Sequence, residues 1–285
     1  MSQIRVGISG WRYAPWRGTF YPKGLAQKRE LEYASQHLST IEINGSFYAL
    51  QTPKSYQAWH DATPEDFVFS VKGGRFITHT RRLKDVADPL ANFFASGLLK
   101  LGAKLGPILW QLPPSFRYDA ERIAHFLELL PHDTQAAAKL ARRHDEHLKG
   151  ETWTKTDAQR ELRHAMEVRH DSFQQKEFVQ LLRKHGVALV VADTAGRYPY
   201  FEDQTADFTY ARLHGDEELY ASGYTDKALQ NWTKKFRTWC QGKSKRDAFV
   251  YFDNDVKVHA PYDAMSLAYR LKVGPKPEAR DPAQK

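Results

Sequence analysis

Eight short apolar runs alternate with amphipathic segments along the chain, and this alternation restricts the fold more than any other feature of the sequence. Several runs are nearly continuous in valine, isoleucine, leucine and phenylalanine, as expected of strands covered on both faces. The segments between them carry apolar residues at helical spacing, such as Ile123, Phe126 and Leu130. This alternation predicts a parallel sheet. The runs span residues 4–9, 40–44, 67–71, 107–112, 165–168, 187–192, 208–213 and 248–252.

The number of runs and the length of the chain favour one barrel over two separate domains. The chain has 285 residues, and (β/α)8 barrels of the TIM type often contain about 250. An open doubly wound sheet is the competing arrangement. Its dinucleotide-binding form would need a G-x-G-x-x-G turn, which the segment Gly7-Ile-Ser-Gly10-Trp11 lacks. We therefore expect an α/β fold with a single (β/α)8 barrel over residues 1–271.

Two segments lie outside the alternation. Residues 134–164 hold seven Lys or Arg and five Asp or Glu, with hardly any large apolar residue, so we expect a solvated helical hairpin inserted between the fourth helix and the fifth strand. Its break is expected near Lys149-Gly150. Residues 272–285 are rich in proline and charge, and they are expected to form a disordered tail.

The composition of the chain excludes several kinds of site and of protein. The single cysteine, Cys240, excludes an internal disulfide and a cysteine-built zinc or iron–sulfur site. The 42 Lys and Arg outnumber the 34 Asp and Glu, and the resulting charge of +8 attracts anions in general. The first residues are typical of a strand rather than a signal peptide, and the longest strongly apolar stretch, 187–192, is far shorter than the ~20 residues of a membrane span. We expect a cytoplasmic protein with no membrane partner; the sequence does not predict its oligomeric state.

Charged and amide side chains follow the runs at their carboxyl ends, where a parallel barrel places its active site. Residues two apart on a strand share a face, as Glu42 and Asn44 do, and Glu167 and Arg169. One interpretation is that ion pairs only fill this end of the barrel; for the whole set we favour a ligand site. The set comprises Trp11, Glu42, Asn44, Lys72, Gln111, Glu167, Arg169, Asp193, Arg212, His214 and Asn254.

The residue types in this set suggest roles. Arg169 and Arg212 are expected to bind an anion, because a planar guanidinium matches carboxylate and phosphate oxygens. Glu167 or Glu42 would be the general base, with Lys72 as general acid or electrostatic stabiliser. Asp193 is grouped with these catalytic residues. The remaining residues are assigned to substrate binding: Trp11, Asn44, Gln111, His214 and Asn254.

A metal site is a weaker interpretation. Glu167, His170, Asp193, His214 and Asp253 could together supply oxygen and nitrogen ligands to a divalent metal. Arg169 and Arg212 would repel a cation at the same place, so no metal ligand and no cofactor is assigned. The His144-Asp-Glu-His147 segment has a chelating spacing, but it falls in the polar insertion and is expected to be a solvated helix face.

Several ordered motifs resemble the YecE-like family of uncharacterised proteins, the domain of unknown function 72. They are Gly10-Trp-Arg-Tyr-Ala-Pro-Trp16, Phe20-Tyr-Pro22, Ile43-Asn-Gly-Ser-Phe-Tyr48, Phe69-Ser-Val-Lys72, Gln111-Leu-Pro-Pro114, Glu167-Val-Arg-His170 and Tyr251-Phe-Asp-Asn254. The resemblance implies a TIM barrel and brings no established reaction. It carries over Glu42, Lys72, Gln111, Glu167, Arg169, Asp193, Arg212 and Asn254. The chain departs from the family at Asp253-Asn254, where two asparagines are usual, and at Asp263-Ala264, where Asn-Ala is usual.

The leading hypothesis is an enzyme that acts by acid/base chemistry on a small anionic substrate bearing phosphate or carboxylate. A nucleic-acid-binding barrel, or one that processes nucleic acid with a metal, is the second hypothesis. It rests on the charge of +8, the basic stretch 75–84 and loop aromatics able to stack on bases. A non-catalytic partner-binding protein is the third, with the insertion 134–164 as its interface.

Overall fold

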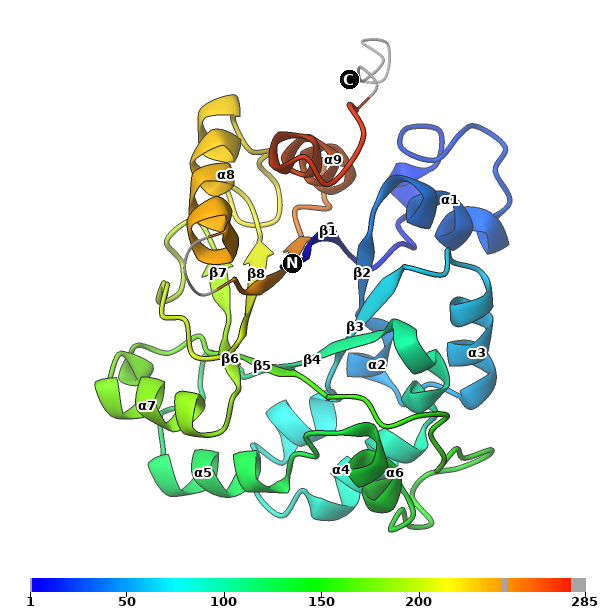
Figure 1. Ribbon diagram of the computed structural model, residues 1–285, viewed down its shortest axis with the longest axis vertical. Helices are drawn as coiled ribbons and strands as arrows, with labels where there is room; N and C mark the ends of the chain where they lie inside the picture. The colour runs from blue at the N-terminus through cyan, green and yellow to red at the C-terminus, as the bar shows by residue number, and fades with distance from the viewer. Residues whose placement is uncertain (1, 242–244, 278–285) are drawn as a thin grey trace. The chain divides into compact units, whose positions relative to one another are not determined.

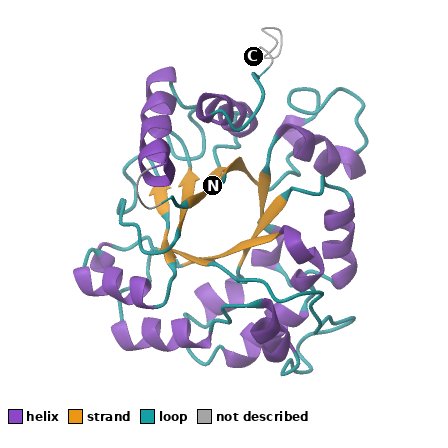
Figure 2. Ribbon diagram, in the orientation of Figure 1, coloured by secondary structure: helices purple, strands orange, loops and turns teal. Residues whose placement is uncertain are grey.

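Within residues 2–241 and 245–277, which the computed structural model describes, nine strands form one sheet in the order β6-β5-β4-β3-β2-β1-β9-β8-β7 (Figure 2). The described strand pairs are parallel. The strands are β1 (Ile4–Ser9), β2 (Thr40–Ile43), β3 (Val68–Lys72), β4 (Leu105–Gln111), β5 (His164–Glu167), β6 (Ala188–Leu189), β7 (Val191–Asp193), β8 (Phe208–Leu213) and β9 (Asp247–Phe252).

The strand count differs from the expected eight because the sixth run is divided. Its first part, β6, pairs with β5, and its second part, β7, pairs with β8. Val190 alone separates the two parts, so the two ends of the sheet order are successive pieces of one run. This is the topology of a (β/α)8 barrel. The α/β barrel prediction is confirmed.

The chain divides into two compact units. The first unit contains Met1–Glu42 and Val190–Lys285. Its registers pair Ser9 with Glu42 and Leu213 with Phe252, which aligns the carboxyl ends of neighbouring strands. Helix α9 packs against β1 and against α8 (Figure 1). The helices are α1 (Glu30–His37), α8 (Asp226–Gln241) and α9 (Ala260–Leu271), with the helical turns η1 (Ala14–Trp16) and η2 (Gln27–Arg29).

The second unit contains Ile43–Leu189. Capping side chains begin several of its helices. Thr52 accepts a hydrogen bond from the Ser55 amide at the start of α3, and Asp119 accepts one from the Arg122 amide at the start of α5. The helices are α2 (Gly45–Tyr48), α3 (Pro53–Asp61), α4 (Ala87–Ala95), α5 (Ala120–Leu129), α6 (Thr134–Ala141) and α7 (Lys176–Lys184), with the helical turns η3 (Phe76–Thr80), η4 (Leu98–Lys104) and η5 (Asp171–Phe173).

The core of the second unit surrounds Trp110. Its ring centre lies 5.5 Å from that of Phe93 and 5.2 Å from that of Phe126. The chain leaving β3 passes against the same indole, because a Cβ on Gly73 would lie 2.3 Å from the ring. Glycine is therefore required directly after Lys72, and the packing of Trp110 sets where that lysine leaves the strand.

The insertion differs in part from the expected helical hairpin. Its first part is helical: α6 is capped by Asp133, buries three alanines and packs against α4 (Figure 1). Residues 142–163 form no second helix, since they lack apolar side chains at helical spacing. They are held to α4 by hydrogen bonds, from Asn92 Nδ2 to Asp145 Oδ1 at 2.8 Å and from the Asp145 amide to Asn92 Oδ1 at 3.0 Å. His144 and His147 consequently do not share a helix face.

Residues 278–285, the greater part of the expected disordered tail, lie outside the described residues. No helix in the described part of the chain is long and apolar enough to cross a membrane.

Candidate functional site

Each predicted site residue lies within two positions of the carboxyl end of a strand. In a parallel barrel this end of the sheet carries the active site. The first unit holds Trp11, Glu42, Asp193, Arg212, His214 and Asn254, and the second holds Asn44, Lys72, Gln111, Glu167 and Arg169. That all of them form a single site stays a prediction.

In the first unit, Glu42 and Arg212 form a buried pair. Arg212 Nε lies 3.1 Å from Glu42 Oε2, and Nη2 lies 2.9 Å from Oε1. Glu42 also accepts hydrogen bonds from Ser9 Oγ at 3.0 Å and from the Tyr210 hydroxyl at 2.7 Å. The Glu42 side chain is 0% exposed and that of Arg212 is 1% exposed. Four donors fill the acceptor positions of this carboxylate.

Further carboxyl groups surround the same arginine. Arg212 Nη2 donates to Asp253 Oδ2 at 2.8 Å, and His214 Nδ1 lies 3.1 Å from that oxygen. Burial, and then the neighbouring charge of Asp253, raises the pKa of Asp255 well above its ordinary value. Asp255 Oδ1 is buried and accepts no hydrogen bond from the described residues. The positive charge of Arg212 is therefore balanced by Glu42 and Asp253, beside a carboxyl group that favours its neutral form.

Asp193 and Asn254 have local partners in the first unit. The Tyr224 hydroxyl donates to Asp193 Oδ2 at 3.0 Å, while burial raises the pKa of this aspartate. Asn254 Nδ2 donates to Asp263 Oδ2 at 2.8 Å, and the same oxygen accepts from the Tyr224 amide at 3.0 Å. Asp263, one of the departures from the family pattern, thus ties the loop after β8 to α9. Trp11 is buried, and its carbonyl accepts a hydrogen bond from a tyrosine hydroxyl.

In the second unit, strand register brings three predicted residues to adjacent strand ends. Lys72 pairs with Leu109 two residues before Gln111, and Gln111 pairs with Glu167. Glu167 Oε1 accepts a hydrogen bond from Arg169 Nε at 2.7 Å, with the Glu167 side chain 0% and the Arg169 side chain 10% exposed. This arrangement places a buried carboxylate and its guanidinium partner at the carboxyl end of β5, next to the end of β4.

The charge of Lys72 lies beside aromatic rings. Its Nζ is 4.6 Å from the centre of the Phe47 ring, and its side chain is mostly buried. The same phenylalanine ring packs edge-on against the imidazole of His79, with their centres 5.0 Å apart. Phe47 lies on α2, and Asn44 is the residue directly before that helix. The Oδ1 atom of Asn44 is buried and accepts no hydrogen bond from the described part of the chain.

His79 lies within a concentration of positive charge. Its pKa is lowered to about 4, first by partial burial and then by Lys72, Arg75, Arg169 and Arg82. The imidazole is therefore neutral near pH 7. His79 is not among the site residues predicted from the sequence, although it lies in the basic stretch 75–84.

The described residues form no metal-binding cluster. Among residues 2–241 and 245–277, no group of three or more His, Cys, Asp or Glu is arranged to hold a metal ion. His170, one of the metal candidates, has its ring Nδ1 2.9 Å from Ser172 Oγ at the start of η5.

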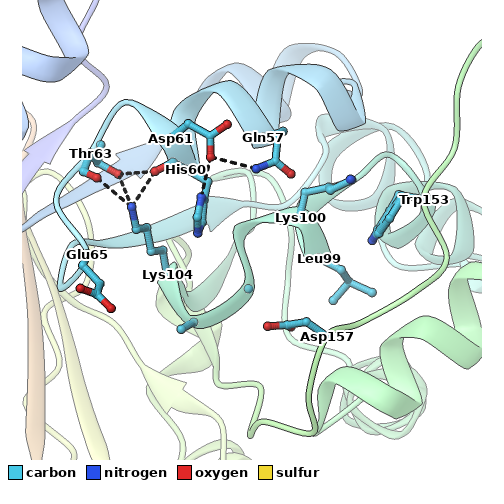
Figure 3. A pocket seen from close by; sticks show the side chains of 12 residues that line it. Gln57, His60, Asp61, Thr63, Glu65, Leu99, Lys100, Lys104, Trp153 and Asp157 are labelled. Carbon is cyan, nitrogen blue, oxygen red and sulfur yellow. Dashed lines mark hydrogen bonds and ion pairs between the residues drawn. The ribbon is translucent and has the colours of Figure 1, made fainter.

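A cavity of about 620 Å³ lies before the amino ends of β3 and β4, so it is not at the strand ends that carry the predicted residues (Figure 3). One of its walls is built around Lys104, whose Nζ donates to the carbonyls of His60 and Thr63 at 2.6 and 2.8 Å. Lys100 Nζ lies 3.5 Å from the centre of the Trp153 ring on another side. These contacts bind the insertion and α3 to the segment before β4.

Comparison with known proteins gives matches to one family. A family described as “Protein of unknown function DUF72” matches residues 5–285. The UPF0759 protein YunF of Bacillus subtilis (strain 168) is 30% identical over 127 residues, which cover 43% of this chain and 44% of the relative. The UPF0759 protein YecE of Escherichia coli (strain K12) is 29% identical over 129 residues, with 45% and 44% covered. The chain thus spans less than half the length of these curated relatives in its matches.

Solved structures share the fold over nearly the whole chain. A DUF72 family protein from Thermotoga maritima MSB8 matches with a TM-score of 0.74 and 24% identity, covering 95% of this chain and 99% of that one. Another from Enterococcus faecalis V583 matches with a TM-score of 0.70 and 17% identity, covering 98% and 100%. At these identities the likeness concerns the fold alone.

Proposed function

The chain belongs to the DUF72 family of proteins of unknown function, and we propose that it is an enzyme that binds an anionic substrate at the carboxyl ends of β3, β4 and β5. One observation carries the proposal: positive charges from three parts of the second unit each lower the pKa of the single imidazole of His79. These charges belong to Lys72, Arg75, Arg82 and Arg169. Like charges repel one another, and a bound anion would offset this repulsion.

The surroundings of these cations suit phosphate or carboxylate. Arg169 presents a planar guanidinium whose orientation is set by its hydrogen bond to the buried Glu167. Lys72 is 8% exposed, so its charge is screened less by solvent than a surface lysine would be. The amides of Gln111 and Asn44 lie at neighbouring strand ends and add groups that can hydrogen-bond to a ligand.

Acid/base chemistry is assigned to Glu167, Lys72 and His79. Glu167 is the carboxylate at this place and is the candidate base. His79 is neutral in the free protein, and an anion beside it would raise its pKa towards neutrality, which is the range useful for proton transfer. Glu42 is assigned to positioning Arg212, because its carboxylate already accepts from four donors.

Calorimetric titration with inorganic phosphate and with succinate tests the proposal. We expect at least one of these probes to bind, and Lys72→Met and Arg169→Met to weaken its binding about tenfold or more each. Lys235→Met is the matched control, because Lys235 is a partly exposed cation of the first unit paired with Glu202. Failure of both probes to bind, or equal weakening by the control, would overturn the proposal.

A further inference from the structure

The helical turn η3 contributes to two different surroundings. His79, near its end, is affected by the charges of Lys72 and Arg169. Phe76 and Ile77, at its start, line a separate cavity of about 490 Å³. Cavities of about 300–1,000 Å³ are typical of small-molecule sites. One turn of five residues therefore joins the proposed anion site to a cavity of ligand size.

The cavity begins next to the anion site in the chain. Gly74 lines it, two residues after Lys72 and one before Arg75. A Cβ on Gly74 would meet nothing closer than 3.9 Å, so this part of the wall is open. The wall of the cavity therefore begins between Lys72 and Arg75 along the chain.

The lining of the cavity indicates what would enter it. Leu50, Phe76, Ile77 and Pro89 form an apolar wall, and the Phe76 side chain is 55% exposed in the free protein. An exposed aromatic ring is a stacking surface for a planar group.

The polar part of the lining is rich in acceptors. Asp85, Asp88 and Asp145 contribute carboxylates. The Arg81 guanidinium is paired with Asp85, and the His147 imidazole lies 3.1 Å from Asp145. A group seated here should therefore donate hydrogen bonds rather than accept them.

Building on the anion site proposed above, we propose that the ligand is a nucleotide whose base carries an exocyclic amine. Its phosphate would bind Lys72, Arg75 and Arg169, and its base would stack on Phe76 inside the cavity. An anion with an aliphatic group would offer these carboxylates no hydrogen-bond donor, and a sugar phosphate would leave the Phe76 face uncovered. Either a free nucleotide or a nucleotide within a single strand supplies this chemistry.

The test compares inorganic phosphate, adenosine 5′-monophosphate and inosine 5′-monophosphate, which lacks the amine, by calorimetry on the full chain. We expect the adenosine nucleotide to bind at least about tenfold more tightly than phosphate, and more tightly than the inosine nucleotide. Phe76→Ala should remove about tenfold of the adenosine affinity and leave phosphate binding unchanged. Tyr269→Ala, at an aromatic residue of α9 that is 48% exposed, is the matched control and should change neither.

The outcomes separate this inference from the proposed function. Phosphate binding without a preference for the adenosine nucleotide, or a preference that survives Phe76→Ala, overturns the inference and leaves the anion site intact. Failure of every anion to bind overturns both. A short single-stranded oligoadenylate distinguishes the two sources of the nucleotide. If it binds more tightly than the mononucleotide, and Phe76→Ala removes this gain, the ligand is a nucleotide within a single strand.

Discussion

Arg212 holds Glu42 in a two-point contact, with Nε to Oε2 at 3.1 Å and Nη2 to Oε1 at 2.9 Å, and both side chains are buried. The contact joins β2 to β8, and the two residues are 170 positions apart in sequence. Paired buried charges are costly to separate, because either one left alone in the interior has lost its hydration. We therefore regard this pair as a fixed support of the first unit and place ligand binding on the cations of the second.

Breaking this pair should destabilise the protein strongly. Arg212→Met leaves Glu42 buried without its counter-charge, and we expect a loss of about 3–5 kcal/mol in the free energy of unfolding, measured by urea denaturation. Arg29→Met makes the same change in an exposed pair with Glu32 and should cost far less, because solvent screens that pair. Equal effects of the two substitutions would show that Arg212 is not a structural support.

The pKa of Asp255 predicts a specific pH dependence. Its pKa in the folded protein is raised above the ordinary value of 3.8, so above pH 3.8 the folded state retains a proton that the unfolded state has released. Stability contributed by this group therefore falls as pH rises from 3.8 through the raised folded pKa. Asp255→Asn removes this titration. Its stability relative to the wild type should increase between pH 4 and pH 7, and denaturation curves that stay parallel over that range would contradict the assignment.

His164 has the opposite dependence. It is buried, its Nδ1 is 3.1 Å from Trp110 Nε1, its Nε2 is 2.8 Å from the Pro131 carbonyl, and burial lowers its pKa from 6.5 to about 4. Below pH 6.5 the unfolded state gains a proton that the folded state lacks, so stability is lost as pH falls from 6.5 to about 4. The loss should total about 3 kcal/mol. His164→Gln should reduce it, whereas His147→Gln at an exposed ring should not; identical acid profiles for both variants would refute the prediction.

Two adjacent glycines provide a matched test of the packing behind Lys72. A Cβ at position 73 would lie 2.3 Å from the Trp110 ring, whereas a Cβ at position 74 meets nothing nearer than 3.9 Å. Gly73→Ala should cost about 1–3 kcal/mol through overpacking. Gly74→Ala should be close to neutral. Thermal unfolding of both variants measures the difference, and equal melting temperatures would contradict the close approach of the strand to the indole.

Much of the fold could be predicted from the sequence because burial on both faces leaves a local signature. The run before Lys72 is almost entirely apolar, and β3 ends at that lysine, as expected of a strand whose other residues are buried in the core. The division of the sixth run at Val190 could not be predicted, since its residues are uniformly apolar and only pairing with β5 or β8 distinguishes the two parts.

The hydrogen-bond partners of the candidate residues could not be predicted from the sequence. Nothing local to Glu42 indicates that Arg212 and Tyr210 donate to it, because those contacts depend on register between distant strands. His79 was missed for a related reason: it lies in a segment without periodicity, and its surroundings come from the ends of β3 and β5 as well as from its own loop.

The central claim is that the cations around His79 form an anion site, and the titration of His79 itself tests it most directly. NMR of the imidazole, assigned with His79→Gln, should give a pKa of about 4 in the free protein and a clearly higher pKa in saturating inorganic phosphate, because the bound anion offsets Lys72 and Arg169. His164, whose pKa is also lowered to about 4, by burial and without a contribution from these cations, is the internal control and should not move. A His79 pKa that is the same with and without phosphate would contradict the account.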